Sequence, residues 1–218
     1  MEKKVMQLTG TLGGTPQRSD ARSTRARILT TARQRLRDDP DASLDSIARA
    51  AGVARRTLYW HFSTRQALVD ALTQEADQAL RQAFTAARVP GADSLEALAR
   101  TALAAWAVGD QYHMLISMGR RRLGEDTIRA ILAPTREEAV ATVRRGQEEG
   151  VFADHVPATV LAPALEALLL ALAAENAASS WADPTGEGAA TALLVATGVA
   201  PEEAALRVRN VLRESDEH

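Results

Sequence analysis

The 218-residue sequence contains no cysteine, which excludes disulfides, thiolate metal sites and cysteine nucleophiles. Of its 26 basic residues, only Lys3 and Lys4 are lysines. The N-terminal stretch lacks the continuous apolar segment of a signal peptide, and we identify no run that approaches the roughly 20 apolar residues of a membrane span. The sequence therefore predicts a cytoplasmic protein that is neither secreted nor inserted in a membrane.

Motifs that typify enzymes are also missing. The sequence has no G-x-G-x-x-G, no P-loop, no H-E-x-x-H and no G-x-S-x-G. The four histidines, at positions 61, 113, 155 and 218, do not have the spacing of metal ligands. We therefore expect no enzymatic activity, no cofactor and no metal site.

Charge is unevenly distributed along the chain, although its net value is only -2. Residues 1–65 hold thirteen Lys or Arg against six Asp or Glu, a net of +7, and residues 66–218 hold thirteen against twenty-two, a net of -9. Such an asymmetry indicates that the basic part meets a polyanion while the acidic part has another task.

The hydrophobic pattern predicts an all-α protein, because no alternating strand pattern or βαβ rhythm occurs. We expect a flexible arm at 1–20, a small helical domain at 21–66 and a larger helical domain at 67–218. Glycines and prolines divide the chain into expected helices at 23–37, 44–51, 54–61, 65–88, 93–107, 110–118, 125–149, 157–181, 187–198 and 201–214.

Residues 44–62, LDSIARA-AG-VARRTLYWHF, have the pattern of a helix-turn-helix, in which Gly52 can adopt the positive φ that ends the first helix. The spacing turns one set of side chains inward: Val53, Leu58 and Phe62, with Ile47, Ala48, Ile28, Leu29 and Leu36 from the preceding helices. It leaves another set outward: Arg55, Arg56, Thr57, Tyr59, Trp60 and His61. Two arginines beside aromatic rings on an exposed helix are typical of a surface that enters the major groove.

The stretches TRARILTTARQRL (24–36), SLDSIARAAGV (43–53) and above all RTLYWHFSTRQAL (56–68) resemble the TetR family of bacterial transcription regulators. The last one matches that family's run T-x-Y-x-H-F-x-x-K-x-x-L. The resemblance covers residues 24 to about 70, and the remainder is similar only in length and helical character. Three departures stand out: Ala54 replaces the usual Ser or Thr cap, Arg56 replaces a common glycine, and Asp38-Asp39-Pro40 occupies the place of a glycine between the first two helices.

The resemblance implies that Tyr59, His61 and Arg65 contact phosphates and that Thr57 contacts the backbone or a base. Arg55, Arg56 and Trp60 fall where the family varies, so we expect them to select bases, since arginine can bind guanine O6 and N7 together. His61 could instead pack at the helix end, and Trp60 could brace the fourth helix. The full predicted DNA-binding set is Arg22, Arg25, Ser43, Arg55, Arg56, Thr57, Tyr59, Trp60, His61 and Arg65.

The same resemblance implies that residues 21–66 are a helix-turn-helix DNA-binding domain and that residues 67–218 are an effector-binding and dimerisation domain. The candidate pocket residues are Phe84, Trp106, Tyr112, His113, Met114, Met118, Glu175 and Asn176. The candidate dimer interface is a leucine and alanine surface on the helices at 157–181 and 187–214, with Leu161, Ala164, Leu165, Leu168, Ala171 and Leu172. Core packing is the alternative for each of these side chains.

The sequence thus predicts a homodimeric repressor that binds a palindromic, double-stranded DNA operator and is released by a small-molecule effector. The alternative is a ligand-independent DNA-binding or architectural protein whose C-terminal domain serves only for dimerisation.

Overall fold

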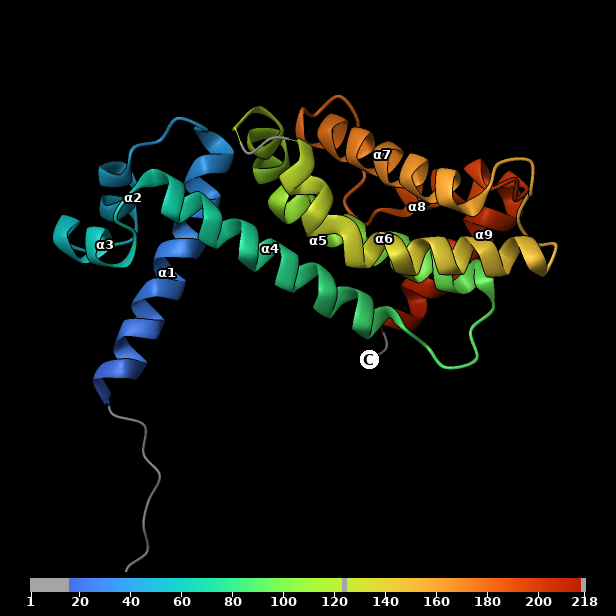
Figure 1. Ribbon diagram of the computed structural model, residues 1–218, viewed down its shortest axis with the longest axis horizontal. Coiled ribbons are helices and arrows are strands. Elements are labelled where there is room, and N and C mark those ends of the chain that lie inside the picture. Colours follow the sequence, from blue (N-terminus) through green and yellow to red (C-terminus); the bar gives the residue numbers. More distant parts are fainter. Residues whose placement is uncertain (1–15, 123–124, 217–218) are drawn as a thin grey trace, which may run out of the picture. The chain divides into compact units, whose positions relative to one another are not determined.

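The computed structural model describes the backbone of residues 16–122 and 125–216, and side-chain surroundings within 20–109, 111–112 and 136–215. All regular structure within these residues is helical (Figure 1), which confirms the all-α prediction. The helices are α1 (Pro16–Asp38), α2 (Leu44–Ala50), α3 (Arg55–His61), α4 (Arg65–Ala87), α5 (Ser94–Arg122), α6 (Glu125–Glu148), α7 (Ala158–Ala177), α8 (Glu187–Ala196) and α9 (Pro201–Asp216). They form two compact units, residues 1–68 and 69–218.

Helix α1 begins earlier than the sequence predicts. The expected arm at 1–20 lies mostly outside the described residues, but its last part, from Pro16 onward, is helical. Proline suits the first turn of a helix, because its fixed φ is helical and its missing N–H would have had no partner there. The helix continues to Asp38, just before the turn that contains Pro40.

The core of the first unit is the one that the hydrophobic spacing predicts. Ile28, Leu36, Ile47 and Leu58 are completely buried, and Phe62 is 2% exposed. Among the side chains expected to face inward, Val53 is the exception, since it is only half-buried. Three helices of one small unit therefore share a single core, with the second and third joined by the glycine turn.

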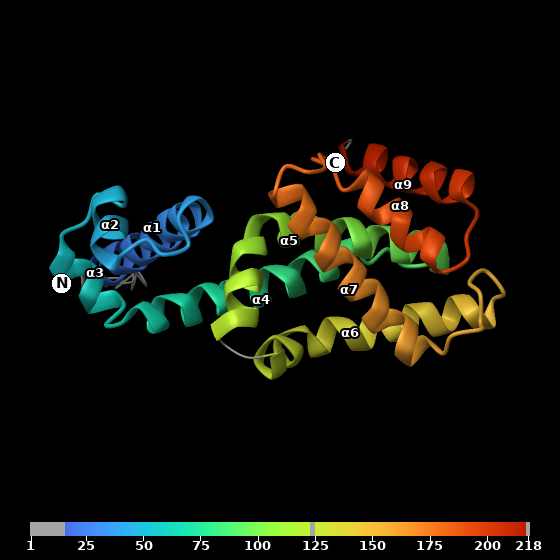
Figure 2. The ribbon, with the colours of Figure 1, turned by 90° about the horizontal axis from the view of Figure 1, so that it is seen from above.

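In the second unit, α5 is the central helix and packs against α6, α7, α8 and α9. Figure 2 shows α8 and α9 side by side along one flank of this unit. The core is built mainly of leucine, alanine and valine, with Leu98, Val143, Leu194 and Val208 among its most buried members. This arrangement places the acidic half of the chain in a helical bundle with a core of its own.

Two expected breaks in the second unit do not occur. The sequence predicts helices at 93–107 and 110–118 divided by Gly109, whereas α5 runs unbroken from Ser94 to Arg122, through Gly119 as well. A glycine inside a helix costs only about 1 kcal/mol relative to alanine. Gly109 does not adopt a positive φ, and burial of α5 side chains such as Leu98 and Trp106 outweighs that cost.

Helix α7 ends at Ala177 rather than at the expected residue 181. Ser179 takes a left-handed φ of 59°, which ends the helix, and the Asn176 side chain accepts a hydrogen bond from the backbone N–H of Asp183 at 2.9 Å. The loop that follows packs Trp181 edge-to-face on Trp106, with ring centroids 5.8 Å apart. The indole N–H of Trp106 donates to the Asp183 carbonyl at 3.1 Å, so this loop is fixed against α5.

Helix α7 is long and apolar enough to cross a membrane, whereas the sequence analysis predicts no membrane span. A stretch of 18 of its 20 residues has a mean hydropathy of 1.7, and 28% of that stretch is buried in the unit. Length and composition alone do not separate a membrane span from a core helix. Here α7 contributes Leu161 and Leu165 to the core. Its Glu166 forms a bidentate ion pair with Arg136, with Nη2–Oε1 and Nε–Oε2 distances of 2.7 and 2.9 Å.

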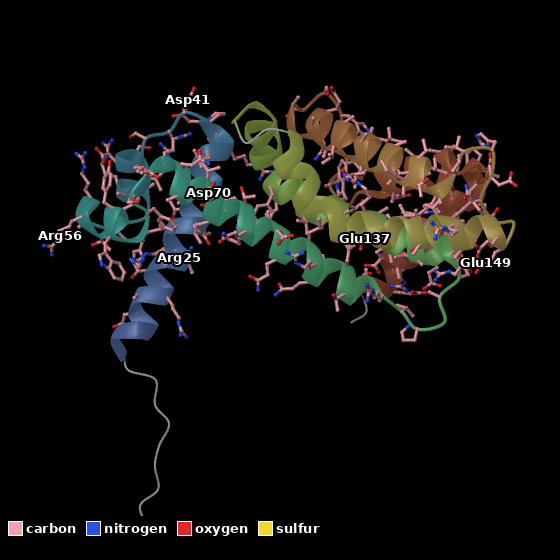
Figure 3. The ribbon with its side chains drawn as sticks, viewed as in Figure 1. Arg25, Asp41, Arg56, Asp70, Glu137 and Glu149 are labelled. Atoms are coloured by element: carbon pink, nitrogen blue, oxygen red, sulfur yellow. The ribbon has the colours of Figure 1, made fainter. Side chains whose placement is uncertain are left out.

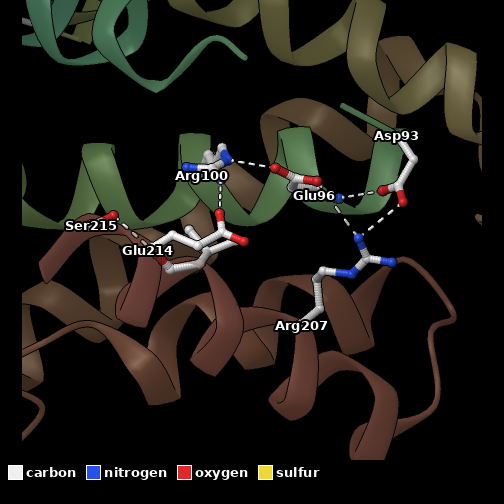
Figure 4. Close-up of polar contacts among 7 residues, drawn as sticks. Asp93, Glu96, Arg100, Arg207, Glu214 and Ser215 are labelled. Atoms are coloured by element: carbon white, nitrogen blue, oxygen red, sulfur yellow. Dashed lines mark hydrogen bonds and ion pairs between the residues drawn. The ribbon is translucent and has the colours of Figure 1, made fainter. Parts of the chain in front are cut away.

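An ion-pair network fastens α9 to the start of α5 (Figure 4). Arg100 pairs with Glu96 at 2.8 Å and also with Glu214 of α9. Arg207 of α9 in turn lies 3.0 Å from Asp93 and 3.8 Å from Glu96. Because Arg100 is only 14% exposed, this network is better shielded from salt than an isolated surface pair.

Candidate nucleic-acid interface

Helix α3 is held at both ends by local features of the sequence. Ser43 Oγ accepts a hydrogen bond from the Ser46 N–H at 3.1 Å and caps α2. Gly52 has a φ of 62°, as the glycine turn requires, and confirms the predicted stop between the two helices. Ala54 precedes α3 without any side-chain cap, as expected from its missing hydroxyl. Thr64 Oγ1 then caps α4 by accepting from the Ala67 N–H at 3.0 Å.

The buried anchors Leu58 and Phe62 direct the rest of α3 toward solvent. Arg55 and Arg56 are exposed, Tyr59 is 37% exposed and Trp60 is 74% exposed. In Figure 3 the Arg56 side chain extends away from the helices of its unit. Arg56, half-buried Thr57 and Trp60 line a shallow hollow of about 380 Å³. Trp60 is therefore largely exposed and is not a core residue of its unit.

Arg55 is held more firmly than the other arginine of the helix. Its Nε lies 2.9 Å from Asp45 Oδ1 on α2, and its guanidinium lies over the Tyr59 ring at 5.4 Å from the centroid. The Arg55 side chain is nevertheless 69% exposed. Asp45 is a site residue that the sequence did not single out beyond its place in the first turn of α2. No linear signal marks it, because the pair depends on the angle between the two helices.

His61 lies at the edge between core and surface. Its ring is half-buried and meets the Trp60 ring edge-on, with centroids 4.6 Å apart. Burial, together with the charge of nearby Arg25, lowers the pKa of His61. The lowered pKa favours the neutral imidazole, which has one ring N–H with which to donate a hydrogen bond. Arg25, on α1, also lies over the Phe62 ring at 5.2 Å from the centroid.

Arg65 and Ser43 have partners inside the protein. The Arg65 guanidinium donates to the carbonyls of Pro40 and Ala42, which ties the start of α4 to the turn between α1 and α2. Ser43 acts as the helix cap described above. Arg22 and Arg25 are exposed on α1. The DNA contacts predicted for these four residues stay predictions, and those of Arg65 and Ser43 must coexist with their intramolecular bonds.

The predicted ligand residues are not brought together into one described cavity. Phe84 and Trp106 are buried, and Tyr112, also buried, donates from its hydroxyl to Glu75 at 3.0 Å. Asn176 supports the loop after α7, and exposed Glu175 accepts from the Ser180 hydroxyl at 2.6 Å. The side chains of His113, Met114 and Met118 lie outside the described residues. The ligand assignment remains a prediction, and for Trp106 and Asn176 the observed contacts are structural.

The predicted dimer residues divide into two faces of α7. Leu161 and Leu165 belong to the core of the second unit, and Leu168 and Leu172 are half-buried against it. Ala164 and Ala171 lie on the exposed face, where Val160 is 58% exposed. Leu161 and Leu165 thus pack within one chain, as the core alternative allowed, and the dimer interface stays a prediction for the partly or fully exposed side chains.

The fold and this surface together define an all-helical protein with a helix-turn-helix DNA-binding unit. A family model described as "Bacterial regulatory proteins, tetR family" matches residues 28–72, from the first core residue of α1 to Leu72 of α4. The N-terminal unit of this chain therefore has the sequence pattern of that family.

Curated relatives match about a third of the chain. An uncharacterized HTH-type transcriptional regulator, TtgW of Pseudomonas putida, is 38% identical over 69 residues, which cover 31% of this chain and 52% of that protein. The HTH-type transcriptional regulator EthR of Mycobacterium tuberculosis is 37% identical over 82 residues, which cover 35% of this chain and 37% of EthR. The chain therefore spans about half the length, or less, of the curated relatives that it matches.

Solved structures extend the likeness to most of the chain. The TetR family regulator PfmR from Thermus thermophilus has a TM-score of 0.64 at 22% identity, over 79% of this chain and 98% of that one. The TetR-like regulator LfrR from Mycobacterium smegmatis, solved with proflavine, has a TM-score of 0.65 at 23% identity, over 82% and 96%. At these identities the match establishes the fold of the C-terminal unit and not its ligand.

Proposed function

We propose that the protein is a homodimeric transcription regulator that represses by binding a palindromic DNA operator and is released by a small-molecule effector. The observation that carries the proposal is the outward face of α3, where Arg55, Arg56, Tyr59 and Trp60 are exposed on a helix anchored by two buried side chains. Positive charge supplies affinity for phosphates, and arginine and aromatic side chains can contact base edges.

The effector acts by preferring one spacing of the two reading units. One spacing of the reading units fits the operator and another does not. Ligand binding releases DNA only if the ligand has the higher affinity for the spacing that does not fit. A ligand-bearing relative of the same fold supports this part, since LfrR was solved with proflavine. We propose an apolar or amphipathic small molecule as the effector class, bound within the C-terminal unit.

Dimerisation uses the exposed alanine face of α7 together with the last helices. Small side chains let two helices approach closely, and Ala164 and Ala171 are exposed beside Val160. Two-fold symmetry of the protein would then match a palindromic operator with half-sites about one helical turn, or a multiple of it, apart.

The proposal predicts steeply salt-dependent binding to the DNA upstream of the protein's own gene. Each phosphate neutralised by arginine releases a counterion, so log K should fall linearly with log salt with a slope of about -0.9 per phosphate contact. Fluorescence anisotropy of a labelled duplex, at salt concentrations from about 50 to about 300 mM NaCl, measures the slope. Absence of binding there, or a flat salt response, would contradict the proposed function.

Replacing the two phosphate candidates should weaken binding to all sequences alike. In the double variant Tyr59→Phe with His61→Ala, each reading unit loses two hydrogen-bond donors to the DNA phosphates. The salt dependence of binding should change little, because neither donor carries a charge. Affinity should fall by at least about thirtyfold for specific and random duplexes together, because a dimer loses four hydrogen bonds of about 0.5–1.5 kcal/mol each. His155→Ala, at an exposed histidine of the other unit, is the matched control. A selective loss for one sequence would move these residues into the base-reading group.

A further inference from the structure

We propose that Arg55 reads a guanine in the major groove and that Asp45 is the positioning residue that orients its guanidinium for this contact. The inference rests on the proposed DNA-binding function and adds to it a base and a residue on α2. It starts from the contacts of Arg55, which differ from those of its neighbour Arg56.

The Arg55 guanidinium is constrained from two sides. Asp45 Oδ1 lies 2.9 Å from Nε, and the Tyr59 ring lies under the guanidinium, 5.4 Å from the centroid. Both terminal nitrogens, Nη1 and Nη2, are left without a hydrogen-bond partner among the described residues. Arg56 has neither constraint within the same part of the chain.

The free edge of the guanidinium is the one that guanine requires. Because Asp45 lies on the Nε side of the guanidinium, the outer N–H groups of Nη1 and Nη2 are left parallel to each other, and these two donors match guanine O6 and N7. A phosphate could accept the same pair of donors. The carboxylate of Asp45 disfavours that second arrangement, because it would bring a phosphate close to a like charge. Arg55 is also in the first turn of α3, the part of a recognition helix whose side chains reach base edges.

Stability does not account for the Asp45–Arg55 pair. The Arg55 and Asp45 side chains are 69% and 40% exposed, and pairs that exposed contribute little to folding. Asp45 Oδ1 itself is out of contact with solvent and accepts no hydrogen bond of good geometry, so Arg55 compensates it as an ion pair. Orientation is the effect that remains: a guanidinium that is already ordered loses less conformational freedom when it binds a base.

The test is selection of binding sites by the full-length protein from a pool of randomised DNA duplexes, followed by competition between duplexes that differ at one base pair. The wild type should select a guanine in each half-site. Arg55→Ala and Arg55→Lys should both lose the preference at that base, by roughly tenfold or more, and Arg55→Lys should keep the salt dependence because it keeps the charge. Other positions of the selected site should be unchanged.

Asp45→Asn should affect the overall affinity for DNA and the preference for guanine differently. Removing a negative charge from the DNA-facing side should leave binding to all duplexes equal or tighter, while the preference for guanine should fall by roughly three- to tenfold as ordering is lost. Adding Asp45→Asn to Arg55→Ala should cause no further loss of preference. Asp38→Asn, which removes the same charge from an exposed position on α1, should leave the preference intact.

The outcomes distinguish this inference from the proposed function. A wild-type protein that selects no sequence and binds no duplex overturns both. A wild type that selects a site overturns the inference alone if Arg55→Ala leaves every base preference unchanged, or if the base lost is not guanine. Equal losses of affinity and preference in Asp45→Asn, together with a lower melting temperature, would make Asp45 a structural residue and overturn its positioning role.

Discussion

Leu58→Ala is expected to destabilise the DNA-reading unit by about 2–5 kcal/mol and to abolish specific DNA binding. Leu58 is completely buried and is the one residue within α3 that is buried. Its loss removes apolar contacts and leaves a cavity that a seven-residue helix is too short to close by itself. Because small domains are stable by only about 5–15 kcal/mol, the reading surface would be unfolded for a substantial fraction of the time.

Amide hydrogen exchange, followed for residues 44–68, reports this loss locally, and anisotropy with a selected duplex reports binding. Trp60→Ala is the matched control, since Trp60 is on the same helix but 74% exposed. It should change stability by no more than about 0.5 kcal/mol, whatever it does to base preference. Normal exchange protection in Leu58→Ala would show that α3 is held by something other than its buried leucine.

Gly186→Ala is expected to destabilise the C-terminal unit by about 2–5 kcal/mol, through two costs that add. Gly186 has a φ of 79°, a left-handed conformation that costs an alanine about 1–2 kcal/mol. A Cβ at this position would also lie 2.5 Å from Trp106 Cδ1. Trp106 is 2% exposed and its indole N–H donates to the Asp183 carbonyl, so moving the ring would disturb the core and break this bond.

Gly150→Ala is the control that shows the conformational cost alone, so that the cost of the clash with Trp106 follows by difference. Gly150 has a similar φ of 72°, but a Cβ there would meet nothing within 4 Å. This control should lose only the conformational part, about 1–2 kcal/mol, and urea unfolding monitored by circular dichroism measures the difference between the two variants. Equal losses in both would mean that the loop after α7 shifts readily away from Trp106.

Much of the fold follows from short-range patterns in the sequence. Buried Ile28, Leu36 and Leu58 recur at helical spacing, and Gly52 marks a turn that needs a positive φ. Prediction from such patterns fails where the same local sequence is compatible with two structures, such as a helix end and a helix interior. Gly109 looks like a helix end, yet lies inside α5, because contacts along the whole helix outweigh the small cost of one glycine.

In the candidate DNA-binding site, too, some side-chain positions follow from local sequence and others depend on tertiary contacts. The outward placement of Arg55, Arg56 and Trp60 follows from helical periodicity once Leu58 and Phe62 face the core. The fixing of Arg55 by Asp45, ten positions earlier, does not, because it depends on how α2 and α3 cross. Nor does the attachment of Arg65 to carbonyls of the turn before α2.

By itself, the sequence determined that this protein is helical, that its basic N-terminal part carries a helix-turn-helix, and which face of α3 meets solvent. These properties depend on spacing of about one helical turn, which is local. Tertiary structure decided which arginine of α3 is oriented and which is free, that Leu161 and Leu165 of α7 pack inward while Ala164 and Ala171 are exposed, and that Trp106 is buried beneath the loop after α7. Each of these depends on contacts between residues distant in sequence, which periodicity does not encode.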